Sequence, residues 1–214
     1  GAFRPIAEVT HYSAAWKLYM LAFALPTIAL QAVTPMAASF HGRGDTEGLR
    51  RLLLRMGKYS AAVALPLTLA LGLSAGTLLR VWMGPGFVEA RWVVVVLAGS
   101  FAVTSFNHAG YSILVGMRQV SALFWLYWLP QAVLNILLSL WLVQPLGIVG
   151  VALGTAIPAV LLEYSFLRHV LGRLDVGWRP FFAGVVRPAV IPGVVAFSPL
   201  VIAYAVEGPV YLAL

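Results

Sequence analysis

The chain is divided into apolar blocks that are longer than the ~18–20 residues a helix needs to cross a lipid bilayer. Of its 214 residues, 61% are hydrophobic and only 10% are charged. A soluble domain of this size carries about 25% charged residues, so this chain lacks the charge to cover a water-facing surface. The sequence therefore predicts an all-α, polytopic transmembrane helix bundle.

The apolar stretches between charged residues predict five good spans and a sixth, partial one that prolines interrupt. They are expected at residues 12–40, 59–79, 92–115, 121–143, 147–167 and 181–206. Because the chain opens on Gly1 and stops at Leu214 within an apolar run, we expect it to be a piece of a longer protein.

The basic residues predict an orientation. Ten of the 14 Lys and Arg residues fall in connections on one side of the predicted bundle, with five of the ten in residues 41–58. Cytoplasmic loops carry an excess of Lys and Arg, so residues 41–58 are expected in the cytoplasm. These charges lie in loops and are not interleaved with exposed aromatics as base stacking would need, so nucleic acid is not an expected partner.

Residues 45–58 have the pattern of a short amphipathic helix. Asp45 is a candidate N-cap, and an apolar stripe follows at i, i+3, i+4 and i+7: Leu49, Leu52, Leu53 and Met56. Four cations lie off that stripe: Arg50, Arg51, Arg55 and Lys58. We predict an interfacial helix whose apolar side enters the inner leaflet and whose cations meet anionic lipid headgroups. The alternative is an ordinary helical linker.

No pattern of catalytic or metal-binding residues is found. The chain has no cysteine, and its four histidines lack metal-ligand spacing. A phosphate-binding glycine loop and a nucleophile elbow are also missing. We therefore expect no enzymatic activity, no metal and no cofactor. The spacing of Gly150 and Gly154 is typical of a close approach by another helix.

Polar side chains inside spans are costly in lipid and face a cavity or another helix. The candidates for lining a substrate cavity are Lys17, Gln31, Ser100, Thr104, Asn107, Tyr111, Gln131 and Asn135. The residues of the third and fourth spans form stripes, for which hydrogen bonding between helices is the alternative. Lys17 can also reach the outer headgroups. We expect Glu163, near the cytoplasmic end of its span, to meet water or Arg168 rather than to bind a coupling proton.

Several motifs resemble the C-terminal part of Wzx-type polysaccharide flippases, which belong to the multidrug/oligosaccharidyl-lipid/polysaccharide exporter superfamily. The resemblance runs from about Tyr12 to Glu163. The motifs that carry it are residues 35–39 with Gly44 and Asp45, residues 49–53, residues 78–84 with Phe87, residues 114–116 with Arg118, and residues 135–140 with 147–158.

The resemblance implies a MATE-like fold of two helix bundles around a cavity, of which this chain holds the second. The N-terminal bundle of the same full-length protein is then its partner. The implied substrate is a polyprenyl-pyrophosphate-linked oligosaccharide, moved across the bacterial inner membrane by alternating access. Two other readings stay open: a multidrug exporter of the same superfamily, and a membrane scaffold subunit that does not transport. A membrane enzyme is disfavoured, because no long loop carries paired carboxylates.

Lys17 gives a direct test of the cavity hypothesis. If its charge pairs with the pyrophosphate, Lys17→Ala in the complete protein should abolish glycan display at the cell surface, whereas Lys17→Arg should retain part of it. If Lys17 only anchors the helix at the headgroups, Lys17→Ala should be nearly silent, because Trp16 and Tyr12 can replace it. Normal display at an unchanged protein level would contradict the cavity role.

Overall fold

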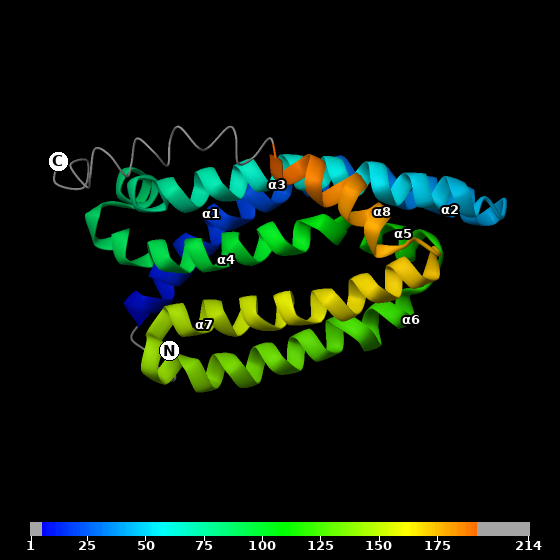
Figure 1. Cartoon of the computed structure of the whole chain (residues 1–214). Helices are drawn as coiled ribbons and strands as arrows, with labels where there is room; N and C mark the ends of the chain where they lie inside the picture. The colour runs from blue at the N-terminus through cyan, green and yellow to red at the C-terminus, as the bar shows by residue number, and fades with distance from the viewer. Residues whose placement is uncertain (1–5, 192–214) are drawn as a thin grey trace.

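The computed structural model describes residues 6–191, and this part of the chain is built from helices without a β-strand. Figure 1 shows them lying side by side in one elongated bundle. In chain order they are α1 (Ile6–Leu30), α2 (Val33–Gly42), α3 (Thr46–Met83), η1 (Pro85–Ala90), α4 (Arg91–Thr104), η2 (Ser105–Asn107), α5 (His108–Gly116), α6 (Val120–Leu123), η3 (Phe124–Trp128), α7 (Leu129–Arg173), α8 (Trp178–Phe181) and η4 (Phe182–Val186).

Four helical stretches of the described residues are long and apolar enough to cross a membrane. They are Glu8–Gly42, Thr46–Met83, Pro85–Gly116 and Val120–Arg173. The last stretch folds back on itself at Gly147, whose φ of 58° and ψ of −139° are not helical, so it supplies two antiparallel arms (Figure 1). These two arms correspond to the spans expected at 121–143 and 147–167. Of the span expected at 181–206, residues 181–191 are helical, and 192–206 lie outside the described residues.

The two arms of α7 approach closely because glycines face the first arm. A Cβ atom on Gly150 would overlap the carbonyl of Leu142, and one on Gly154 would lie 2.8 Å from Cα of Ser139. Hydrogen bonds join the arms beside this contact: Asn135 Nδ2 donates to Thr155 Oγ1 at 2.7 Å. The helix that the glycine spacing predicted as a close neighbour is therefore the preceding arm of the same chain.

Helix α3 is longer than the sequence predicted. The expected interfacial helix at 45–58 and the span at 59–79 form one continuous helix, capped by Asp45, whose Oδ1 accepts from the backbone N–H of Gly48 at 2.7 Å. Leu49, Leu52 and Leu53 are at most 5% exposed because they pack into the protein core with α2, α5 and the end of α7. The apolar stripe is thus taken up by protein, and it is not free to enter a lipid leaflet.

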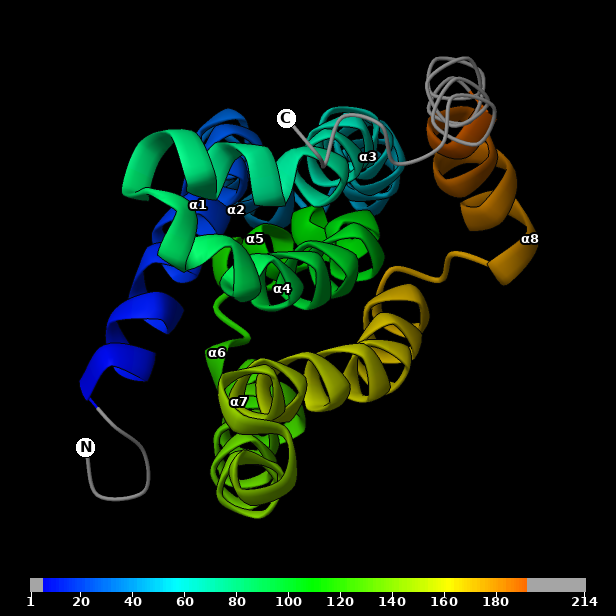
Figure 2. The same cartoon turned by 90° about the vertical axis from the view of Figure 1, so that its left-hand side faces the viewer.

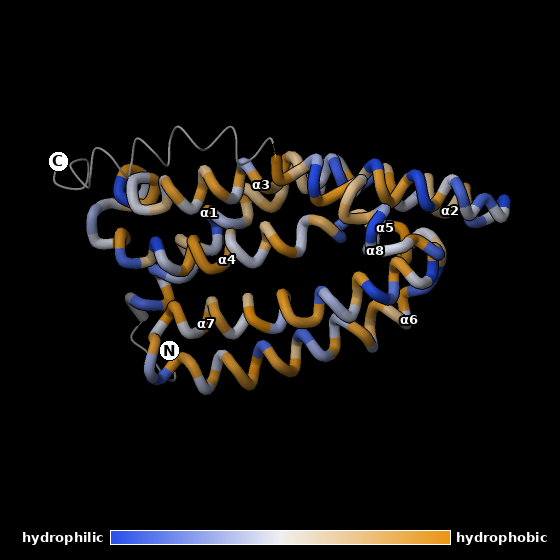
Figure 3. Tube along the Cα trace, viewed as in Figure 1, coloured by the Kyte–Doolittle hydropathy of each residue, from blue (hydrophilic) through white to orange (hydrophobic). Residues whose placement is uncertain are grey.

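The helices are arranged around α4 and α3. Helix α3 packs against α1, α4 and the π-helical segment η4, while the hairpin of α7 packs against α4; seen end-on, α7 forms a separate layer below α4 (Figure 2). Hydrophilic residues gather at the end of the bundle where α2 lies and α3 begins (Figure 3). The end of α7 lies at that same end, and η1 lies at the opposite one (Figure 1).

The Gly154 contact predicts a site-specific loss of stability. In Gly154→Ala the new methyl group must displace the backbone at Ser139, so we expect a loss of about 1–3 kcal/mol, typical of overpacking, and a lower Tm in detergent. Gly72→Ala is the matched control, because nothing lies within 4 Å of its Cβ position in α3 and alanine favours a helix. Equal Tm values for the two variants would contradict the close packing of the arms.

The alternation of the helix ends predicts which loops are accessible. Residues 1–214 contain no cysteine, so single cysteines can be placed at the exposed positions Thr46, Gly172 and Pro85 in a protein without other cysteines. An impermeant thiol reagent added to intact cells should label Pro85→Cys and spare the other two. Labelling of Thr46→Cys from outside would reverse the orientation.

Candidate functional site

The second arm of α7 carries two groups of polar residues on opposite faces near its end. Ser165, His169 and Arg173 recur every fourth residue and therefore share one face of the helix. Glu163 lies about 200° around the helix from Ser165, on the face that buries Phe166 and Val170 in the core. One helix thus presents basic groups outward and an acidic group inward.

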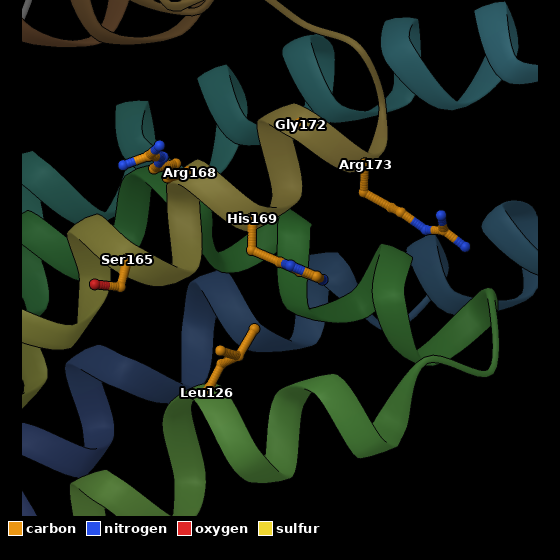
Figure 4. Close-up of a pocket in the computed structure, with 6 residues that line it drawn as sticks. All are labelled: Leu126, Ser165, Arg168, His169, Gly172 and Arg173. Carbon is orange, nitrogen blue, oxygen red and sulfur yellow. The ribbon is translucent and has the colours of Figure 1, made fainter.

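The outward face forms a basic pocket of about 480 Å³, lined by Leu126, Ser165, Arg168, His169, Gly172 and Arg173. Five of these residues come from α7, and Leu126 comes from η3 on the neighbouring arm. Figure 4 shows His169 and Arg173 extending from α7 on the side where Leu126 rises toward them. The side chains of Arg168 and Arg173 reach exposed surface, while His169 is half-buried.

This basic pocket is free to take an anion. Among residues 6–191, no acidic side chain pairs with Arg168 or Arg173, and Nε2 of His169 is buried without a hydrogen-bond partner. Guanidinium groups bind phosphate through parallel, charge-assisted N–H···O bonds. The pocket therefore has the chemistry of a phosphate site with an apolar wall at Leu126.

The inward face forms a buried polar cluster of Glu163, Asn107 and Tyr111. Glu163 is 5% exposed and Asn107 is fully buried. The two side chains are neighbours, and the Tyr111 hydroxyl also faces the carboxyl of Glu163. None of the polar side-chain atoms of these three residues makes a hydrogen bond of standard geometry. The ring of Tyr111 stacks on Phe166 at 4.2 Å, and Tyr127 packs edge-on against Tyr111 at 5.1 Å between ring centroids.

The expectation that Glu163 meets water or Arg168 is wrong. The Glu163 carboxyl is turned into the core, whereas Arg168 lines the pocket on the outward side. The sequence predicted the depth of Glu163 along the span correctly as near one end. It gave no sign of the direction, because the direction depends on which face of α7 packs against α5.

Local irregularities in the helices place residues of both groups. The π-helical segment η3 contributes Leu126 to the basic pocket, and its Tyr127 packs against Tyr111 of the polar cluster. The short 3₁₀ turn η2 interrupts the third predicted span and ends at Asn107. Interruptions of this kind inside helices often accompany functional sites or strain, and here they coincide with the two groups of polar residues.

The structure gives the other predicted cavity residues different surroundings. In the fourth span, Gln131 Nε2 donates to the carbonyl of Thr155 at 3.1 Å, and Asn135 bonds to the Thr155 hydroxyl. In the third span, the hydroxyls of Ser100 and Thr104 donate to carbonyls of their own helix. Only Asn107 and Tyr111 of that stripe join the buried cluster. The stripe of the fourth span thus forms hydrogen bonds between helices, which was the alternative to lining a cavity.

The remaining candidates, Gln31 and the five predicted cations, also differ in their surroundings. Lys17 and Gln31 lie on exposed positions of the α1 region. Arg50 is held by protein: its Nε donates to the carbonyl of Leu174 at 2.7 Å, and its guanidinium pairs with Asp175 at 2.6 Å. Arg51 and Arg55 stay exposed, and Lys58 lies 5.0 Å from the ring centroid of Tyr59.

Sequence reasoning missed the basic pocket, although a signal was present. Arg168 and Arg173 belong to the basic residues that predict the orientation, and His169 is one of the four histidines without metal-ligand spacing. The recurrence of Ser165, His169 and Arg173 at every fourth residue indicates a polar face at the end of the fifth span. The contribution of Leu126 could not be found in this way, because it depends on the packing of η3 against α7.

Comparison with known proteins places the chain among membrane proteins. It is 27% identical over 182 residues to the uncharacterized membrane protein EpsK of Bacillus subtilis (strain 168), a match that covers 83% of this chain and 35% of EpsK. The chain therefore spans about a third of that relative's length. No family model matches the chain, and no solved structure does. The chain is thus a multi-pass membrane protein related to another membrane protein.

Proposed function

We propose that the chain is part of a transporter that moves a lipid-linked oligosaccharide across the bacterial inner membrane for polysaccharide export. The observation that supports this function is the basic pocket at the end of α7, with two guanidinium groups that have no acidic partner among the described residues. A pyrophosphate that joins a glycan to a polyprenyl chain is an anion of the kind such a pocket binds.

The surroundings of the pocket suit an amphiphilic ligand. Leu126 forms its apolar wall, and exposed apolar surface continues along the same arms at Trp125 and at Leu161, which is one turn before Ser165. A lipid tail can lie along this surface while the phosphates meet Arg168 and Arg173. Basic pockets between membrane helices on the cytoplasmic side recognise lipid headgroups in this manner.

Polar residues outside the basic pocket also have a role in this proposal. Lys17 and Gln31 of the α1 region are exposed and, in this proposal, face the cavity shared with the N-terminal bundle of the same protein. In this proposal Arg51, which also pairs with Glu47 at 3.5 Å, and Arg55 meet anionic lipid around the transporter. The protein then carries its substrate by alternating access and needs no catalytic residue or metal.

The basic pocket also favours this function over the two alternatives. A multidrug exporter that carries organic cations gains nothing from Arg168 and Arg173, because like charges repel. A scaffold subunit also carries cytoplasmic arginines, but it does not require them to line one pocket beside an exposed apolar wall.

Neutralising the pocket tests the function. In the complete protein, the double variant Arg168→Gln/Arg173→Gln should reduce glycan display at the cell surface by roughly tenfold or more, since hydrogen bonds to charged groups contribute about 1.5–3 kcal/mol. Arg168→Lys/Arg173→Lys should recover part of it. Surface display measured by glycan-specific labelling, with protein level checked by blot, gives the comparison.

The control is Arg179→Gln, which removes an exposed arginine of α8 that does not line the pocket. It should leave display unchanged. Full display in the double glutamine variant at wild-type protein level would exclude a phosphate-binding role for the pocket. Drug resistance without any glycan display would instead support the multidrug exporter.

A further inference from the structure

The buried cluster on the inward face of α7 has an unusual composition for a membrane span. Glu163 is an acid at 5% exposure, and no basic side chain of residues 6–191 forms an ion pair with it. An ionised carboxylate buried without a counter-charge costs several kcal/mol in proteins. A buried acid without a partner therefore requires a positive charge from elsewhere or a bound proton.

The neighbours of Glu163 decide between these possibilities. Asn107 is fully buried, and both its Oδ1 and its Nδ2 lack a hydrogen-bond partner. A protonated carboxyl pairs with a carboxamide through two complementary bonds: the acid O–H donates to the amide oxygen, and the amide N–H donates to the second acid oxygen. A metal cation would use only the oxygen of Asn107 and would leave its N–H facing a positive charge.

We propose that Glu163 and Asn107, closed off by Tyr111, form a buried site that binds one proton within the membrane span. When the proton leaves, the carboxylate keeps only donors of hydrogen bonds, the Asn107 amide and the Tyr111 hydroxyl. The site therefore exists in two states that differ by one charge. The site is inferred from its own residues alone, without reference to the substrate that the protein carries or to a ligand in the basic pocket.

The other titratable groups around the cluster act differently. Tyr111 and Tyr127 are phenols, and the ring centroid of His108 lies 6.0 Å from that of Tyr111. Nδ1 of His108 is buried without a partner, so protonating this histidine would put an uncompensated charge into the core and destabilise the fold at low pH. Glu163 changes the stability in the opposite direction. The folded state holds a proton that the unfolded chain releases, so the free energy of unfolding falls as pH rises.

Stability as a function of pH tests the site without any transport assay. The Tm of the complete protein in detergent should fall by several degrees between about pH 5 and about pH 9. Ordinary carboxylic acids titrate below this range, and lysines titrate above it. Glu163→Gln should remove most of this dependence, because the amide is isosteric and does not ionise. Glu89→Gln makes the same change on an exposed acid of η1 and should keep the wild-type profile.

Two further measurements decide the outcome if Glu163→Gln folds poorly. The infrared spectrum of the wild type at neutral pH should contain the C=O stretch of a protonated carboxylic acid, and Glu163→Asp should shift that band. The Tm at constant pH and ionic strength should be the same in sodium and in choline salts. A missing carboxylic acid band, a sodium-dependent Tm, or a pH profile that Glu163→Gln leaves intact would each overturn the proposal.

Discussion

The constraint on which this structure depends is that lipid offers no water to polar groups. Every backbone N–H and C=O inside the spans must find a partner within the protein, and helices meet this demand without neighbours. The same demand applies to side chains, and the fold meets it in two ways. Hydroxyls such as that of Ser100 bond to their own helix, and amides such as that of Asn135 bond across the α7 hairpin. Glycines at the hairpin contact bring the two arms close enough for these bonds.

The spans could be predicted from the sequence because length and hydrophobicity alone decide what crosses a bilayer. The reversal at Gly147 was also predictable, since Pro145 and Gly147 separate two apolar blocks. The continuity of α3 was not, because the basic residues between 50 and 58 resemble a loop in charge but are good helix formers. Likewise, Leu49 and Leu53 have the same spacing whether the apolar stripe faces lipid or protein. Only the position of α2 and α5 settles which one it meets.

For the candidate site, too, the sequence predicts which residues share a helix face but not what that face contacts. Periodicity shows that Ser165, His169 and Arg173 share a face, and that Glu163 does not share it. Periodicity cannot show which face is buried, because both faces of the second arm also contain apolar residues. The pairing of Glu163 with Asn107 joins residues more than fifty positions apart in sequence, and it depends on the 3₁₀ turn at η2, for which the sequence has no clear signal. The sequence therefore reveals the polar residues of a membrane protein more readily than their partners.

The basic pocket and the buried cluster share two structural elements, α7 and η3. Both are built on the last turns of α7, and η3 touches both through the adjacent residues Leu126 and Tyr127. A change of charge at Glu163 alters which partners Tyr111 and Asn107 require, and Tyr127 packs on Tyr111. Any resulting movement of η3 reaches the pocket wall at Leu126 through a single peptide bond. Thermodynamic linkage makes such an effect reciprocal, so that an anion held in the pocket would change the affinity of the cluster for its proton by the same factor. Binding of an anion that left the pH profile of Tm unchanged would show that α7 only separates the two charges and does not couple them.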